Sequence, residues 1–170
     1  TPYLSHPDPS VKRRSGFLTP YYRSSENLGL SVNVPYFYAP SKSRDFTFNP
    51  RIYSDQDFIF QTEYREVFKK SKIVADMSFN LNKEKNVGED DNTNTHLFAK
   101  IEGELDEKTS YTFKYQNVSS EDYLKIHELM ATTPLIESYS TMTSSFSIGR
   151  SIDEHTNLDT SFIVYEDLSQ

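Results

Sequence analysis

Apolar and polar side chains alternate along one segment of this chain after another. In residues 28–37, one face carries Leu28, Leu30, Val32, Val34 and Tyr36, and the other carries Gly29, Ser31 and Asn33. A period of two residues is typical of a β-strand that has one apolar and one polar face. The sequence therefore predicts an all-β protein.

The alternating segments are separated by turns rich in polar residues, glycine and proline. We predict about nine strands, over residues 15–22, 28–37, 45–54, 57–65, 73–81, 95–105, 110–116, 139–150 and 157–166. Their order favours an antiparallel up-and-down meander. Residues 1–10, which contain three prolines, are expected to form an extended lead-in.

Two connections are much longer than the others. They are residues 82–94 and residues 117–138. Within the second, residues 120–131 are predicted to form a short amphipathic helix capped by Ser119 or Ser120. In a meander both long connections lie at one end of the strands, and the connections at the opposite end are all short. Long outer loops with short inner turns are typical of outer-membrane barrels.

Several classes of function are disfavoured by the composition. The net charge is −7 and the pI is about 5.1, which argues against a nucleic-acid-binding protein. There is no cysteine, and the four histidines do not have the spacing of metal ligands. No run of apolar residues is long enough for a membrane helix. We therefore expect no enzyme activity, no metal and no cofactor.

Each of the first two strands contains a proline, Pro20 in one and Pro35 in the other. Proline has no N–H group to donate to a sheet, so it is normally confined to edges, strand starts or bulges. Two such strands side by side make a weak edge. From the residues alone, the prolines could equally protect an edge strand from aggregation.

The first third of the chain resembles a known family. The segments that carry the resemblance are KRRSGFLTP (residues 12–20), VPYF (34–37) followed by AP, DFTFNPRIYS (45–54) and EYR (63–65). NVSSEDYL (117–124) and SYSTMTSSFSIGR (138–150) extend it more loosely. Together these segments resemble the start of the membrane barrel in the lipopolysaccharide-assembly outer-membrane protein family, of the OstA/LptD type.

This resemblance implies a function and a location. Family members form a large barrel in the bacterial outer membrane, plugged by a small lipoprotein of the LptE type. The barrel receives lipopolysaccharide from a periplasmic bridge through a preceding domain and releases it between its first and last strands. The resemblance implies that Pro20 and Pro35 mark these gate strands. Residues 11–170 would then be an incomplete fragment, a curved open sheet, because bacterial barrels have even strand numbers.

Two further groups of residues are candidates for function. Lys12, Arg13 and Arg14 could contact the phosphates of lipid A, since arginine pairs bidentately with phosphate, or could form a basic anchor at the periplasmic rim. The second group comprises aromatic residues that could lie at the membrane interfaces: Tyr36, Phe37, Tyr38, Tyr53 and Tyr64. Alternatively, these aromatic residues are present because they form strands well.

The alternation is compatible with two architectures. In a barrel the apolar rows face lipid and the polar rows line a hydrated lumen. In a soluble all-β sandwich that serves binding or adhesion, the apolar rows would form the core. Periodicity alone does not separate the two, because both give the same pattern.

Overall fold

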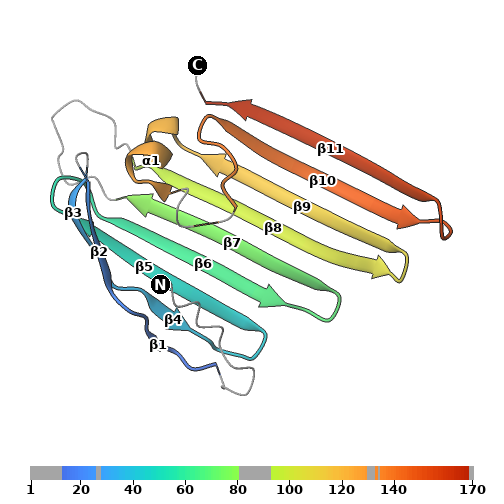
Figure 1. The fold of residues 1–170 in the computed structure, drawn as a ribbon, viewed down its shortest axis with the longest axis horizontal. Coiled ribbons are helices and arrows are strands. Elements are labelled where there is room, and N and C mark those ends of the chain that lie inside the picture. The colour runs from blue at the N-terminus through green and yellow to red at the C-terminus, as the bar shows by residue number, and fades with distance from the viewer. Residues whose placement is uncertain (1–12, 26–27, 81–92, 130–132, 134, 169–170) are drawn as a thin grey trace.

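A computed structural model of the protein describes residues 13–25, 28–80, 93–129, 133 and 135–168. The strands form one antiparallel sheet (Figure 1). They are β1 (Gly16–Phe17), β2 (Tyr21–Ser25), β3 (Gly29–Asn33), β4 (Tyr36–Tyr38), β5 (Arg44–Tyr53), β6 (Ile59–Val67), β7 (Ser71–Asn80), β8 (Thr95–Asp106), β9 (Thr109–Val118), β10 (Thr141–Ser151) and β11 (Asn157–Asp167). One short helix, α1 (Glu121–Ile126), follows β9. Among the described residues, no helix has the length and apolar character needed to cross a membrane.

The predicted meander is confirmed, with a difference in the number of strands. The first predicted strand is divided into β1 and β2, and the second into β3 and β4. From β5 to β11 each strand pairs with its neighbours in sequence, as predicted. The two divisions fall at residues 18–20 and 34–35, which contain Pro20 and Pro35. The prolines therefore account for the additional elements.

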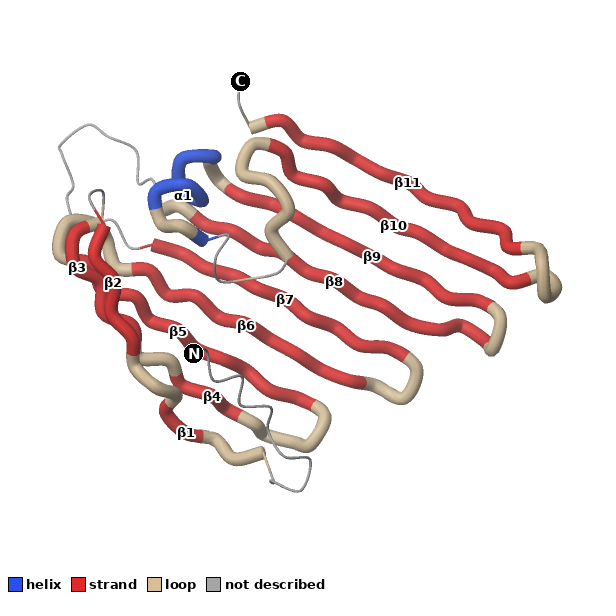
Figure 2. The backbone as a smooth tube through the Cα atoms, in the orientation of Figure 1, coloured by secondary structure: helices blue, strands red, loops and turns tan. Residues whose placement is uncertain are grey.

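The predicted placement of the connections is also confirmed. Figure 2 shows the short turns after β4, β6, β8 and β10 at one end of the sheet. The segment between β9 and β10, the turn after β5, the end of β2 and the start of β3 lie at the other end. Residues 81–92, most of the other long connection, lie outside the described residues, as do residues 1–12 with the lead-in.

The sheet is open at both sides. At one side β11 pairs only with β10, and all eleven of its residues are exposed. At the other side, β1 pairs with β4, and β2 pairs with β3. Among the described residues no strand joins β11 to β1 or β2. This open antiparallel sheet is the fold class that the sequence predicts.

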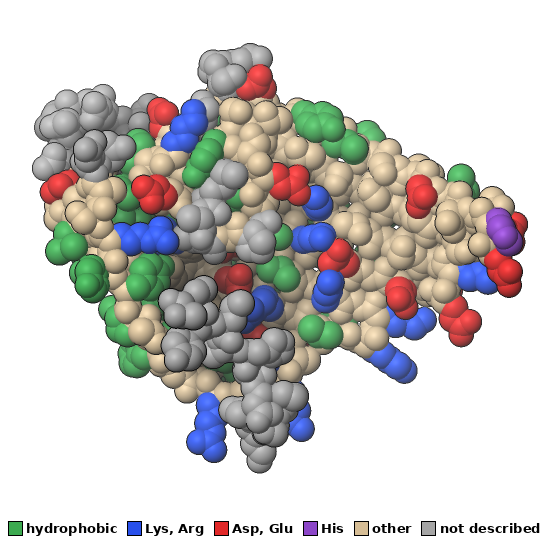
Figure 3. Space-filling model, viewed as in Figure 1, with side chains coloured by type: hydrophobic (Ala, Val, Ile, Leu, Met, Phe, Trp, Pro, Cys, Tyr) green, Lys and Arg blue, Asp and Glu red, His purple; other side chains and the backbone are tan. Residues whose placement is uncertain are grey.

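The two faces of the sheet have opposite chemistry, and the apolar face is the exposed one. On this outer face the side chains of Leu30, Val32, Ile52, Met77, Phe79, Leu97, Phe113 and Phe146 are 38–59% exposed. On the opposite, inner face the side chains of Asn33, Arg51, Gln61, Asp76, Ser78, His96 and Gln116 are only 1–7% exposed. Figure 3 shows basic and acidic side chains spread over the centre of the molecule, on the side where α1 lies. A soluble sandwich would have the reverse arrangement.

The inner face is covered at one end by the segment that follows β9. This covering segment, residues 119–140, packs Tyr123, Leu124 and Leu129 against Ile59 and other sheet residues. The rest of this apolar cluster consists of Leu28, Tyr53, Phe98, Val118, Ile136 and Met142. The cluster is the main apolar core among the described residues, and it holds the covering segment on the sheet.

The helix in the covering segment is shorter than the sequence predicts. Ser120 caps it as expected, because its Oγ accepts a hydrogen bond from the Tyr123 N–H at 3.3 Å. The helix ends at Ile126 rather than at residue 131. Glu128 has a φ of 50°, which is incompatible with a continuing right-handed helix. Residues 130–132 lie outside the described part of the chain.

Candidate functional site

The first hairpin contains a one-residue bulge at its prolines. Phe17 pairs with Tyr36 and Tyr21 pairs with Asn33. Phe17 and Tyr21 are four residues apart, whereas their partners Tyr36 and Asn33 are only three residues apart. The extra residue lies between Phe17 and Tyr21, a segment that includes Pro20. Such bulges disrupt the ladder locally and bend the strand.

Pro35 removes a hydrogen bond from the same hairpin. The N–H of Leu18 donates to the carbonyl oxygen of Pro35 at 2.8 Å. In an antiparallel ladder, residues that are paired in this way normally exchange two hydrogen bonds. Pro35 has no N–H, so the return bond to Leu18 is missing. The pairing between β1 and β4 then extends over only Gly16 and Phe17. Both prolines thus lie where the pairing of the first hairpin is interrupted, between the β1–β4 and β2–β3 ladders.

The basic triplet at the start of the chain is only partly described. Lys12 lies outside the described residues, and Arg14 is exposed. Arg13 forms an ion pair with Asp45 at 2.7 Å, and Arg65 contacts the other carboxylate oxygen of Asp45, also at 2.7 Å. Asp45 therefore fixes Arg13 to the sheet at the end that carries the short turns.

The aromatic candidates are divided between the two faces. Tyr36, Tyr38 and Tyr64 lie on the outer face, where Tyr36 contacts Phe17 and both Tyr38 and Tyr64 contact Phe46. Phe37 pairs with Thr47 and therefore lies on the inner face. Tyr53 is 9% exposed and packs near His127 in the covered cluster. The covered position of Tyr53 does not suit a ring at a membrane interface. The proposal that aromatic rings lie at the interface is therefore retained for Tyr36, Tyr38 and Tyr64.

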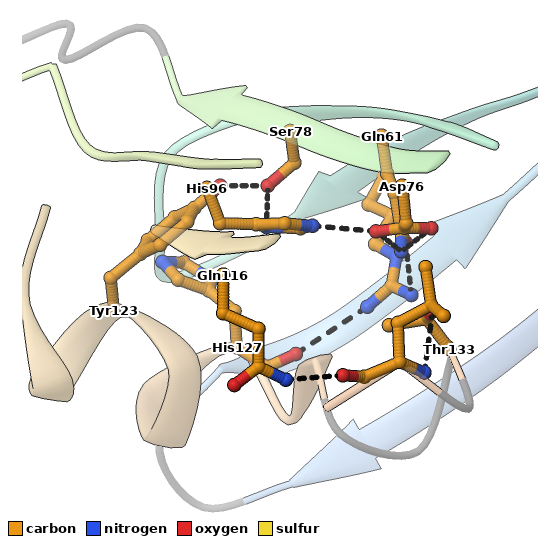
Figure 4. Close-up of polar contacts among 10 residues, drawn as sticks. Gln61, Asp76, Ser78, His96, Gln116, Tyr123, His127 and Thr133 are labelled. Atoms are coloured by element: carbon orange, nitrogen blue, oxygen red, sulfur yellow. Dashed lines mark hydrogen bonds and ion pairs between the residues drawn. The ribbon is translucent and has the colours of Figure 1, made fainter. Parts of the chain in front are cut away.

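A chain of buried hydrogen bonds crosses the inner face from β5 to β8 (Figure 4). Arg51 Nη2 donates to Gln61 Oε1 at 2.7 Å, and Gln61 Nε2 donates to Asp76 Oδ1 at 3.0 Å. Asp76 Oδ1 also lies 2.5 Å from His96 Nε2. These groups are buried, so each depends on the next for a partner that water would otherwise supply.

The same chain continues to the covering segment. Ser78 Oγ lies 2.6 Å from His96 Nδ1 and 2.5 Å from the hydroxyl of Tyr123 on α1. Arg51 Nη1 donates to the backbone oxygen of His127 at 3.4 Å. The helix is thus attached to β5 and β7 by polar as well as apolar contacts.

A second set of contacts holds the later part of the covering segment. Gln116 Nε2 donates to the backbone oxygen of Leu135 at 2.5 Å, and Gln116 Oε1 accepts from the Thr143 N–H at 2.8 Å. Lys114 Nζ forms an ion pair with Glu137 at 2.6 Å. The covering segment is therefore attached at both of its described parts.

The sequence does not predict this network, because the four histidines are far apart in the chain and no motif links them to Gln61, Ser78 or Gln116. A signal was present in the strand register. Gln61, Ser78 and His96 occupy directly paired positions on β6, β7 and β8. Alternation puts each of these residues on a polar face of its strand, but the register is needed to place the three together. Among the described residues, no group of acidic, histidine or cysteine side chains could hold a metal ion.

Burial changes the pKa of two side chains in the covering segment. It raises the pKa of Tyr123 to about 12, so its hydroxyl keeps its proton for hydrogen bonding. Burial, with a smaller contribution from the positive charge of Arg51, lowers the pKa of His127 to about 4. His127 is therefore neutral at pH 7 in the covered state.

Comparison with known proteins confirms the resemblance to the LPS-assembly protein family of the LptD type. LPS-assembly protein LptD of Cupriavidus pinatubonensis is 38% identical over 56 residues, which are 33% of this chain and 7% of that protein. LptD of Pseudoalteromonas translucida is 32% identical over 83 residues, or 49% and 11% of the two chains. LptD of Idiomarina loihiensis is 25% identical over 124 residues, or 72% and 16%. No family model matches the chain.

The chain therefore spans only a small part of these relatives. The matched region is 7–16% of their length.

The low pKa of His127 predicts that the covering segment loosens in acid. Between pH 6.5 and 4, a released His127 binds a proton that the covered residue does not, so falling pH favours release. The effect approaches tenfold per pH unit, because one pKa unit corresponds to ~1.4 kcal/mol. A nitroxide on Lys125→Cys should become more mobile as the pH falls from 7 to 4.5. In His127→Gln, which cannot titrate, the mobility should change little. Equal pH responses in both proteins would contradict this role of His127.

Proposed function

We propose that this chain is the first part of an outer-membrane barrel that assembles lipopolysaccharide into the bacterial outer membrane. The observation that carries the proposal is the exposed apolar outer face combined with a covered, hydrogen-bonded polar inner face. This arrangement is typical of membrane barrels, in which lipid contacts the outside and polar groups line the inside. The similarity to proteins named LPS-assembly protein LptD supports this assignment of the cargo.

The rival function, a soluble all-β sandwich for binding or adhesion, is not favoured. A sandwich buries its apolar rows between two sheets. Here β3, β5 and β7 to β10 each carry exposed apolar side chains on the outer face, and polar side chains occupy many of the covered positions. Exposed apolar area on this scale indicates a surface that contacts another apolar phase or molecule.

The proposal includes partners and a gate. The complete barrel would take lipopolysaccharide from a periplasmic bridge, would contain a lipoprotein plug of the LptE type, and would release the glycolipid beside its first strands. The missing return bond at Pro35 and the bulge beside Pro20 support a gate at this position. Each lost ladder bond lowers the cost of opening by about 0.5–1.5 kcal/mol.

Restoring the two N–H groups should hold the gate closed. In the complete protein, we expect Pro20→Ala with Pro35→Ala to reduce lipopolysaccharide export roughly two- to tenfold. The return bond at position 35 contributes ~0.5–1.5 kcal/mol, and each ~1.4 kcal/mol is a factor of ten. Surface lipopolysaccharide measured by labelling of intact cells would give the rate.

Pro50→Ala is a matched control for this experiment. Pro50 lies in β5, the strand next to the first hairpin, where it pairs with Phe60 and belongs to neither the β1–β4 nor the β2–β3 ladder. Export should be close to normal in this variant. Normal export by the double variant, at equal levels of protein in the membrane, would exclude the gate.

The orientation of the faces can be tested directly. Nitroxide labels on Val32→Cys, Phe48→Cys and Phe79→Cys of the complete protein in lipid should show high collision rates with oxygen, which concentrates in acyl chains. A label on Thr112→Cys, on the inner face, should instead favour a water-soluble nickel reagent. A protein recovered from the aqueous fraction, with the three outer labels shielded from both reagents, would support the soluble sandwich.

The basic triplet is proposed as an anchor at the periplasmic rim. The ion pair between Arg13 and Asp45 supports this role, because it ties Arg13 to the sheet at the end that carries the short turns. We expect the variant with Lys12, Arg13 and Arg14 all replaced by Gln to keep normal crosslinking of lipopolysaccharide to nearby positions. A loss of crosslinking would instead support the phosphate contact.

A further inference from the structure

A hollow lies on the inner face between the first hairpin, β5 and the end of the helix. Its volume is about 200 Å³. The side chains that matter for its chemistry are those of Tyr21, Arg23, Asn33, Arg51, His127 and Glu128. Pockets for drug-sized ligands are typically ~300–1,000 Å³, so this one admits a single small unit. It is next to the proline-containing hairpin but does not include the prolines.

Three residues that line the hollow each have one buried polar atom without a partner among the described residues. These atoms are Arg51 Nε, Asn33 Oδ1 and His127 Nδ1. The three residues are 5%, 3% and 5% exposed. Buried polar groups in proteins nearly always have a hydrogen-bond partner, and an exception calls for an explanation. A ligand in the hollow would supply what these atoms lack.

The charges of the lining residues favour an anion. Arg23 and Arg51 are both cations, and His127 is neutral. The hydrogen bonds of Arg51 described above go to the neutral oxygens of Gln61 and His127. Glu128 is the carboxylate among the lining residues, and it lies 3.7 Å from Arg23 at the rim, where the two side chains are 51% and 53% exposed. The lining therefore has one positive charge in excess.

The remaining lining atoms favour a ligand that also has hydroxyl groups. Asn33 Oδ1 is an acceptor and requires a donor from the ligand, which a fully ionised anion does not provide. Tyr21 and Tyr53 present rings, and Arg23 lies over the Tyr21 ring at 6.0 Å. Aromatic rings beside planar amide and guanidinium groups suit a ligand with both an apolar face and polar edges. An acidic sugar has all of these features.

We propose that this hollow binds one acidic sugar unit, with the carboxylate or other anionic group toward Arg23 and Arg51 and a hydroxyl donated to Asn33 Oδ1. The site lies on the inner face beside the first hairpin, where the polar part of a glycolipid would pass. This assignment to the glycolipid rests on the proposed function. The binding chemistry itself does not, because it depends only on the residues that line the hollow.

The proposal can be tested with D-glucuronate and its neutral counterpart, D-glucose, added to the complete protein in detergent. Saturation-transfer NMR should show saturable binding of glucuronate and at least tenfold weaker binding of glucose. Arg23→Gln should weaken glucuronate binding about fivefold or more, because it removes one of the two cations that line the hollow. Arg23 is half-exposed, so the substitution carries little risk to folding. Asn33→Asp should abolish binding by placing a carboxylate in the hollow.

Arg44→Gln is the matched control. Like Arg23, Arg44 is a half-exposed strand arginine in an ion pair, here with Glu66 at 2.6 Å, but it lies at the other end of the sheet. It should leave glucuronate binding unchanged. The proposal is overturned if glucuronate does not bind saturably, if glucose binds equally well, or if Arg23→Gln and Arg44→Gln have equal effects.

Two further measurements separate this inference from the proposed function. Purified lipopolysaccharide that displaces glucuronate would identify its glycan as the ligand, whereas bound glucuronate that is not displaced would indicate a free sugar acid. Export in the proline variants is measured independently. Absent binding with proline-dependent export refutes only the sugar site, and binding with proline-independent export refutes only the gate.

Discussion

The structure depends on hydrogen bonds that supply partners for the buried polar side chains of the inner face. Once the apolar rows of β3 to β10 point outward, groups such as Asp76, Gln61 and His96 are enclosed on the inner side. An enclosed polar atom without a partner costs about 1–3 kcal/mol, and a charged one costs more. The series of hydrogen bonds from Arg51 to Tyr123 meets this requirement across four strands and a helix. Because a slip of one residue would turn these partners to the other face, the network favours the observed register of β5 to β8.

The inner face is not uniformly polar, and its apolar positions explain where the covering segment lies. Ile59, Phe98 and Val118 interrupt the inward polar rows near the end that carries the long connections. Left uncovered, these side chains would face the polar interior at a cost of ~1.5–3 kcal/mol each. Tyr123 and Leu124 of the covering segment pack on them, and the hydroxyl of Tyr123 also joins the polar network. The segment therefore stabilises both kinds of inner-face residue.

Local periodicity in the sequence was enough to predict the strands but not the contacts between them. The positions of the long strands, the meander and the two chemically distinct faces result from alternation, because the side-chain period of a strand is two. Alternation does not specify which face is covered, and that depends on contacts between distant residues such as Ser78 and Tyr123. The two prolines predict a weakly paired edge, but the bulge between Phe17 and Tyr21 can be located only from their pairing with β4 and β3. The network around His96 is not predicted for the same reason, since its hydrogen-bonded partners are separated by up to 76 residues.

The two open sides of the sheet differ in what they offer a further strand. β11 presents an uninterrupted edge of eleven residues, whereas the opposite edge is divided into β1 and β2 by the bulge beside Pro20. A seam formed between such edges would be limited by the divided one, because hydrogen bonds along a ladder require both strands to remain in register. The weakest pairing within the sheet, between β1 and β4, lies directly behind that edge. Opening between β1 and β4 would therefore break fewer hydrogen bonds than opening between any two neighbouring strands from β5 to β11.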